Sequence, residues 1–197
     1  MMPLRQSKAK SVAIMAMTAA LYAIFFFLSY SVTMPNFTLL YLPIILLGVF
    51  PLWFGKSGLI GCMIGAFIGG VYVESLLPQA AWAESVVALL IYSLNWVLIS
   101  KSAAQAKSTK GIIMLAGVYA LTLFVGTSYI LWQLSVLGIF PMNIAEAFLL
   151  PTFALNLPII LLTCPAMLRA ISPKLKNWGI YAGSLSEWLS NRKKVNA

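Results

Sequence analysis

The chain has 197 residues, of which 61% are hydrophobic and 9% are charged, and its mean hydropathy is +0.94. Because soluble domains are about 45 to 50% apolar, this composition predicts an all-α integral membrane protein. The formal net charge is +9, yet every Lys and Arg lies between or outside the apolar runs. Membrane topology therefore explains the charge, and we expect contact with lipid but no nucleic-acid partner.

The missing residue types narrow the chemistry further. The sequence contains no His and no Asp, which excludes Ser-His-Asp catalysis, His-based metal sites and Walker-type ATP hydrolysis. The two cysteines, Cys62 and Cys164, lie within apolar runs without CxxC spacing, so we interpret them as packing residues. We expect no cofactor, no metal and no enzymatic activity.

Six apolar runs are each close to the roughly 20 residues that a membrane-spanning helix needs. They cover about 11–31, 38–54, 57–75, 82–100, 111–136 and 143–168. The first run is too long for the core of a cleavable signal peptide and is followed by no clear cleavage site, so we expect it to remain as a helix.

The basic residues predict the orientation of these six helices. Lys and Arg occur before the first run, between the second and third, between the fourth and fifth, and after the sixth. The three other loops have none, so the positive-inside rule places both termini in the cytoplasm. We divide the chain into a transmembrane domain, residues 1–172, and a cytoplasmic amphipathic and basic tail, residues 173–197. In the tail, apolar residues recur at helical spacing over 177–191, which predicts a short helix lying on the membrane surface.

The first run carries a stripe of small residues on one helical face, formed by Ala9, Ala13, Ala16, Ala20 and Ala23. In lipid such a stripe allows another helix to approach closely. The partner could belong to this chain or to a separate protein. The third run has a comparable stripe of Gly61, Gly65 and Gly69, for which we expect packing within the bundle, after a tight turn over 54–58.

Polar and aromatic residues gather at the loops predicted to face outward. From this sidedness alone, the candidate substrate-binding residues are Asn36, Trp82, Glu84, Tyr129, Trp132, Gln133, Asn143 and Glu146. They suggest a pocket for a polar, ring-containing solute, which could carry positive charge. The aromatic side chains could equally form the interfacial belt of any membrane protein. Within the apolar runs, Asn95 and Asn156 must either face such a pocket or form interhelical hydrogen bonds.

The first half of the chain resembles the substrate-binding S component of energy-coupling factor (ECF) vitamin transporters. The residues that carry the resemblance are Ala16-x-x-x-Ala20 with Ala9, Ala13 and Ala23, Leu42-Pro43 through Gly48, Phe54-Gly55, Gly58, and Gly61-x-x-x-Gly65. The resemblance implies a six-helix bundle that binds a vitamin or similar micronutrient in its outer half. A separate coupling transmembrane protein and two ATPase subunits would supply energy.

The same resemblance implies that Ala13, Ala16, Ala20 and Ala23 contact the coupling protein. It also implies the cell membrane of a prokaryote. Two other classes remain open from the residues themselves: a self-sufficient carrier driven by protons or sodium through Glu84 or Glu146, and a membrane enzyme or assembly factor.

Overall fold

The computed structural model describes residues 8–29, 33–34, 37–38, 40–72, 76–139 and 141–196. Nearly all of them are helical, and two very short strands pair in an antiparallel hairpin. The elements are α1 (Lys8–Ser29), β1 (Thr33–Met34), β2 (Phe37–Thr38), α2 (Ile44–Phe54), α3 (Lys56–Tyr72), α4 (Pro78–Leu98), α5 (Lys101–Ala104), α6 (Thr109–Val136), α7 (Met142–Asn177) and α8 (Leu185–Asn196). This confirms the expected all-α class.

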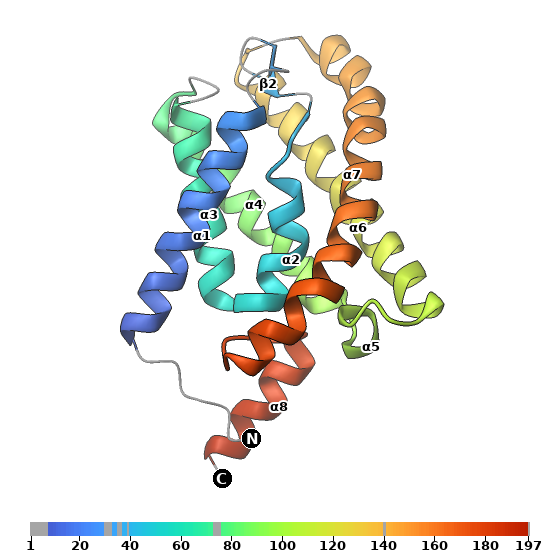
Figure 1. Cartoon of the computed structure of the whole chain (residues 1–197). Helices are drawn as coiled ribbons and strands as arrows, with labels where there is room; N and C mark the ends of the chain where they lie inside the picture. Colours follow the sequence, from blue (N-terminus) through green and yellow to red (C-terminus); the bar gives the residue numbers. More distant parts are fainter. Residues whose placement is uncertain are drawn as a thin grey trace.

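The bundle is arranged around α2 (Figure 1). Helix α1 packs on α3, α3 on α4, α4 on α6 and α6 on α7, while α2 contacts α3, α4 and α7 from the middle. Every residue of α2 except Ile45 is buried. The hairpin of β1 and β2 lies at one end of the bundle, which we call the hairpin end, and α5 lies at the opposite end.

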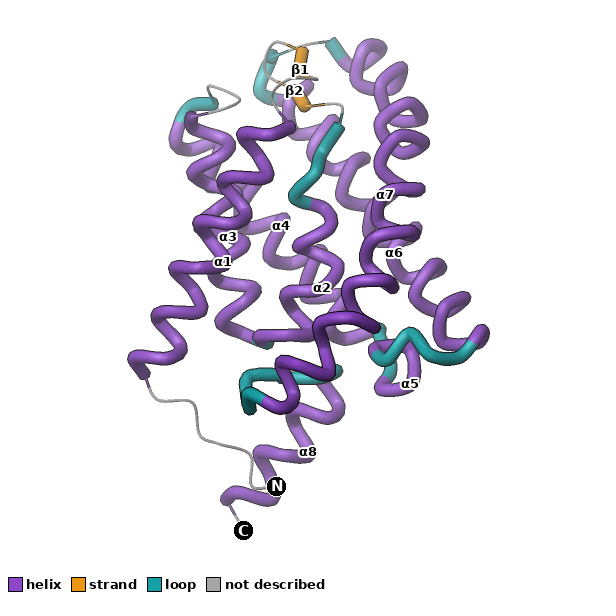
Figure 2. The backbone as a smooth tube through the Cα atoms, in the orientation of Figure 1, coloured by secondary structure: helices purple, strands orange, loops and turns teal. Residues whose placement is uncertain are grey.

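Four of the described helices, α1, α4, α6 and α7, are long and apolar enough to cross a membrane. The predicted second and third spans are shorter: α2 has 11 residues and α3 has 17. At 1.5 Å per residue, α2 covers only about 16 Å of a hydrocarbon layer that is about 30 Å thick. A non-helical segment, residues 40–43, leads into α2 from the hairpin end (Figure 2).

The glycine stripe of α3 determines how closely α1 packs. A Cβ atom at Gly65 would lie 2.6 Å from the Cβ of Tyr22, and Cβ atoms at Gly61 and Gly69 would collide with Thr18 and Phe26. Real Cβ atoms do not approach so closely, so these positions accept only glycine while α1 stays in place. The predicted internal packing of this stripe is confirmed.

The turn between α2 and α3 also follows the sequence prediction. Gly55 has φ of 57°, in the left-handed region that glycine adopts without strain, and it lets the chain reverse with a single residue between the helices. The last carbonyls of α2 are buried and need donors. The backbone N–H of Gly183 donates to Leu52 O, and that of Ala182 donates to Trp53 O, both at 2.9 Å.

The C-terminal helix has other bounds than the sequence predicts. Helix α7 continues past residue 172 to Asn177, the chain then turns, and α8 begins only at Leu185. The side chains of Tyr181, Leu185 and Trp188 pack against the hydrophobic core of the bundle, and the predicted location on a membrane surface stays a prediction. The indole Nε1 of Trp96 donates to Gly183 O at 2.8 Å, which ties this segment to α4.

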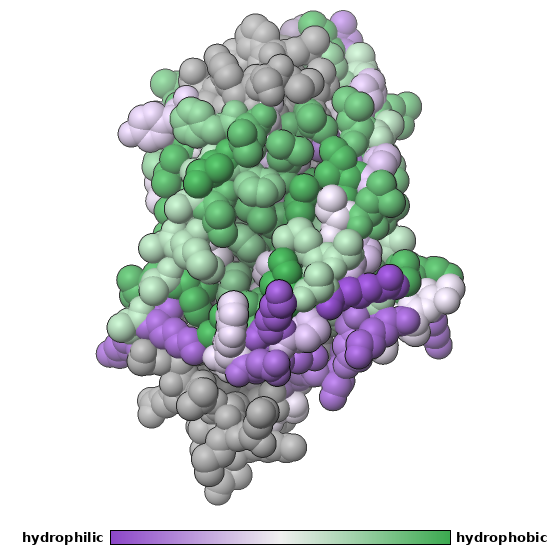
Figure 3. Space-filling view, in the orientation of Figure 1, coloured by the Kyte–Doolittle hydropathy of each residue, from purple (hydrophilic) through white to green (hydrophobic). Residues whose placement is uncertain are grey.

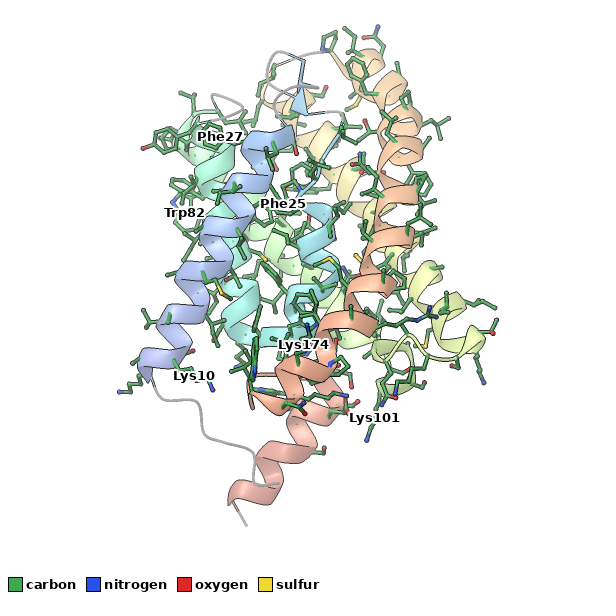
Figure 4. All side chains as sticks on the ribbon, viewed as in Figure 1. Lys10, Phe25, Phe27, Trp82, Lys101 and Lys174 are labelled. Atoms are coloured by element: carbon green, nitrogen blue, oxygen red, sulfur yellow. The ribbon has the colours of Figure 1, made fainter. Side chains whose placement is uncertain are left out.

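The described basic residues gather in a band at the end of the bundle opposite the hairpin, which we call the basic end. In Figure 3 the visible surface above this band is mostly hydrophobic. Lys10, Lys101 and Lys174 lie in the band, whereas Phe27 and Trp82 lie nearer the hairpin end (Figure 4). Four apolar helices and a one-sided charge distribution are consistent with a membrane protein.

Candidate functional site

A cavity of about 50 Å³ lies among α2, α4, α6 and α7, away from both ends of the bundle. It is partly open and has room for a few water molecules or the edge of one small ring. Its polar lining consists of Tyr41, Tyr92, Asn95, Thr122, Thr127, Thr152 and Asn156, and its apolar lining includes Ile44, Leu47, Leu123, Ile130 and Ile160. No charged side chain is among the described residues that line it.

Asn156 supports the backbone beside the cavity. Its Oδ1 accepts a hydrogen bond of 2.8 Å from the backbone N–H of Tyr41, and its Nδ2 donates to Thr152 O. The next backbone N–H, that of Leu42, donates to Ser29 Oγ at 2.9 Å. Non-helical backbone at membrane depth requires such partners, because lipid offers none. These two side chains therefore allow the segment before α2 to be non-helical inside the bundle.

Asn95 is turned toward α6. Its Oδ1 accepts a hydrogen bond of 2.9 Å from Thr122 Oγ1, and only 1% of the residue is exposed. Within the described part of the chain, its Nδ2 has no hydrogen-bond partner. The interhelical hydrogen bond expected as one alternative is present, and the same residue lines the cavity.

Thr152 contributes a free hydroxyl to the cavity lining. The residue is 5% exposed, and its Oγ1 has no hydrogen-bond partner among the described residues. A buried hydroxyl without a partner costs about 1 to 3 kcal/mol, so such groups mark places where a partner is expected to bind. Thr152 lies one turn before Asn156 on α7.

The six candidate residues whose side chains the structure describes do not line this cavity. Trp82 is 48% exposed and its ring lies 5.0 Å from that of Phe67. Tyr129 and Trp132 form a ring pair on α6, with centroids 5.7 Å apart. Their role in binding and their place in an interfacial belt both stay predictions.

The remaining candidates are dispersed. Gln133 is buried, donates from Nε2 to Ala80 O at 3.1 Å, and leaves its Oε1 without a described partner. Asn143 and Glu146 are exposed at the start of α7. For Glu84 the structure gives the backbone position on α4 but not the side chain, and Asn36 lies outside the described residues.

The alanine stripe of α1 faces away from the bundle. Ala13, Ala16 and Ala20 are exposed and Ala23 is half-buried. The opposite face of α1 carries Thr18, Tyr22 and Phe26, which are fully buried against α3. No described element of this chain covers the stripe, so the internal-packing alternative does not apply to it.

The cavity contains residues that the sequence prediction missed, above all Thr152, Thr122 and Tyr92. A usable signal was the spacing of polar residues on α7, where Thr152 precedes Asn156 by one turn, which places both on one helical face. Threonine is common in membrane helices, so this spacing becomes informative only once the neighbouring helices are known.

Comparisons with protein families, with curated proteins and with solved structures gave no match to this chain.

Proposed function

We propose that this chain is the substrate-binding subunit of an ATP-driven uptake system for a vitamin or similar micronutrient in a prokaryotic cell membrane. In this proposal the chain crosses the membrane six times with both termini in the cytoplasm, so the basic end is cytoplasmic. A separate transmembrane coupling protein and two ATPase subunits complete the transporter, because the sequence contains no ATP-binding motif.

The observation that carries the proposal is the exposed alanine stripe on α1. Ala13, Ala16 and Ala20 are exposed on the face opposite α3, beside the larger exposed side chains of Met17 and Ile24, and no described part of the chain covers this surface. Small side chains let another helix approach until backbones are in van der Waals contact, which is the main attraction between helices in lipid. This surface suits a transmembrane partner.

The cavity supports the proposed binding of a substrate by this chain. It is enclosed by four helices, lies within the apolar part of the bundle, and combines apolar walls with a few polar groups, as small-molecule sites do. A proton-coupled carrier has less support, since a proton-coupling site within a membrane is typically built on a carboxylate or a histidine and the described lining has neither.

The substitution Ala16→Leu tests the proposed coupling surface. A leucine side chain at this exposed position would hold a partner helix away, so we expect association with a co-expressed coupling protein and ATPase pair to be lost, and uptake with it. The chain should still fold, because the added atoms point away from α3. Affinity purification from detergent and uptake of a radiolabelled vitamin mixture would measure the two effects.

A matched control is Ala154→Leu, which makes the same change at an exposed position of α7. It should leave association and uptake unchanged. Normal association of the Ala16→Leu protein with the coupling module would contradict the proposal.

A further inference from the structure

We infer that the cavity takes an uncharged solute whose ring edge offers both hydrogen-bond donors and acceptors, such as a neutral heterocycle bearing an amide or a hydroxyl group. This inference rests on the proposed binding function and specifies the class of solute. It differs from the cationic solute that the outward acids and tryptophans suggest from sequence.

The described lining of the cavity is uncharged, which favours a neutral solute. The described residues around the cavity are neutral amides, hydroxyls and hydrocarbon side chains, with no Lys, Arg or Glu among them. Moving an ion into such a site would remove its hydration without providing a counter-charge, which costs several kcal/mol or more. A neutral solute avoids this cost.

Two polar groups at the cavity have no described hydrogen-bond partner and are therefore available to a solute. Thr152 Oγ1 on α7 has no described partner and can either donate or accept. Asn95 Nδ2 on α4 is a donor without a described partner, because Asn95 Oδ1 is already bonded to Thr122. A solute that offers an acceptor to Asn95 and a donor or an acceptor to Thr152 would satisfy both groups.

The walls and the volume of the cavity favour a flat ring. Its walls include the side chains of Ile44, Leu47 and Ile130, and Gly126 of α6 also borders it. Apolar walls beside a few polar groups fit the faces and edge of a flat ring. The volume of about 50 Å³ admits the edge of one ring, so the rest of a larger solute would extend through the open side.

The backbone of Glu84 lies well along α4 from Asn95, and the described lining of the cavity does not include Glu146. Glu84 precedes Asn95 by 11 residues on α4, which corresponds to about 16 Å along the helix axis. Glu146 is exposed near the start of α7. A solute held by Asn95 and Thr152 therefore should not depend on the charge of Glu84.

The test uses purified full-length protein in mild detergent and a defined equimolar mixture of small molecules. Nicotinamide, pyridoxine, riboflavin and uracil represent heterocycles without net charge at pH 7, and nicotinate, biotin, pantothenate and thiamine represent charged compounds. Compounds retained after gel filtration are identified by mass spectrometry, and the affinity of each is measured by calorimetry. We expect retention of at least one neutral compound and of none of the charged ones.

Four substitutions then locate the bound compound. Thr152→Val removes the hydroxyl with little change in shape and should weaken binding about tenfold, whereas Thr152→Ser should restore it. Thr163→Val is the matched control, because the Thr163 hydroxyl bonds to Ile159 O outside the cavity, and it should leave affinity unchanged. Glu84→Gln should also leave it unchanged.

Each other outcome overturns the inference in a distinct way. Retention of a charged compound, or a loss of affinity in Glu84→Gln without one in Thr152→Val, would reject the neutral cavity while leaving the proposed binding subunit intact. Retention of no compound would reject the binding function as well. The coupling function is tested separately by Ala16→Leu.

Discussion

Asn156 and Thr152 lie one turn apart on α7 and both are buried, yet their hydrogen bonding differs. Asn156 uses Oδ1 and Nδ2 to bind the backbone at Tyr41 and Thr152, so its polar atoms serve the fold. Thr152 Oγ1 has no described partner, so its hydroxyl remains for a solute. Hydrogen bonds within the chain thus offset the free-energy cost of burying Asn156, whereas no described bond offsets the cost of burying the Thr152 hydroxyl.

The substitution Asn156→Leu should destabilise the bundle. It leaves the Tyr41 N–H buried without this acceptor, which costs about 1 to 3 kcal/mol. We expect a lower midpoint of thermal unfolding in detergent, measured by circular dichroism. Asn143→Leu makes the same change at an exposed position of the same helix and serves as the control. Equal midpoints for the two variants would show that the 40–43 segment does not depend on Asn156.

The two cysteines lie in the core of the protein. Cys62 and Cys164 are free and buried, and Cys164 Sγ lies 3.4 Å from Ile45 O, next to α2. A Cβ at Gly48 would come within 2.6 Å of that sulfur. This environment agrees with their interpretation as packing residues.

At the scale of elements, α1 has two faces with opposite properties. One face fits into the glycine stripe of α3, and the other presents alanines outward. Because Gly65 brings the α3 backbone against Tyr22, the rotation of α1 is determined by this contact. The outward direction of Ala16 therefore depends on a glycine of another helix.

The substitution Gly65→Ala should disturb this contact. The new Cβ would lie 2.6 Å from Tyr22 Cβ and 2.8 Å from Ala19 O, so α1 must shift, at a cost of about 1 to 3 kcal/mol. We expect reduced thermal stability together with weaker association with the coupling module. Gly117→Ala is the control, since nothing lies within 4 Å of a Cβ there and alanine favours helix. A fully stable Gly65→Ala protein would mean that the two helices are not in tight contact.

Helix α2 and the C-terminal segment form a second coupled pair of elements. The short α2 ends inside the protein, and Ala182 and Gly183 supply donors to its last carbonyls. Lys56 lies 5.4 Å from the centre of the Trp188 ring, and Lys101 Nζ lies 3.6 Å from Glu187 Oε1. The exposed ion pair contributes little, so the backbone hydrogen bonds and the packed rings hold this segment in place.

The two ends of the whole molecule differ in positive charge. Positively charged residues from α1, α5, α6 and α7 lie together at the basic end, and the hairpin end has none among its described residues. Four long apolar helices connect the two ends. A bundle of this kind has one favourable orientation in a membrane that attracts cations to its cytoplasmic side.

This orientation can be tested with single cysteines in a variant whose own cysteines are replaced by alanine. Met142→Cys at the start of α7 should react with a membrane-impermeant maleimide in intact cells. Lys107→Cys, between α5 and α6, should react only after the cells are opened. Both native residues are exposed, so accessibility within the fold does not limit the reaction. Labelling of Lys107→Cys in intact cells would invert the proposed topology.

Much of the helical layout could be predicted from the sequence alone. Apolar runs separated by basic or proline-containing loops indicated the positions of α1, α4, α6 and α7, since length and hydropathy are local properties of the chain. The turn at Gly55 and the close packing of α3 followed from glycine spacing. The exception is α2, where Pro43 and the preceding residues are non-helical because Asn156 and Ser29 bind their backbone.

The cavity was decided only by the tertiary structure. Helical periodicity told which residues share a face, but not which faces of α4, α6 and α7 meet, because that depends on side-chain packing between helices far apart in sequence. Asn95 and Asn156 were recognised from sequence as costly intramembrane amides, whereas Thr152 gained significance only when its hydroxyl was seen at the cavity without a partner. Composition thus determined the class of protein and charge order predicted its sidedness, whereas packing between helices determined where the cavity lies.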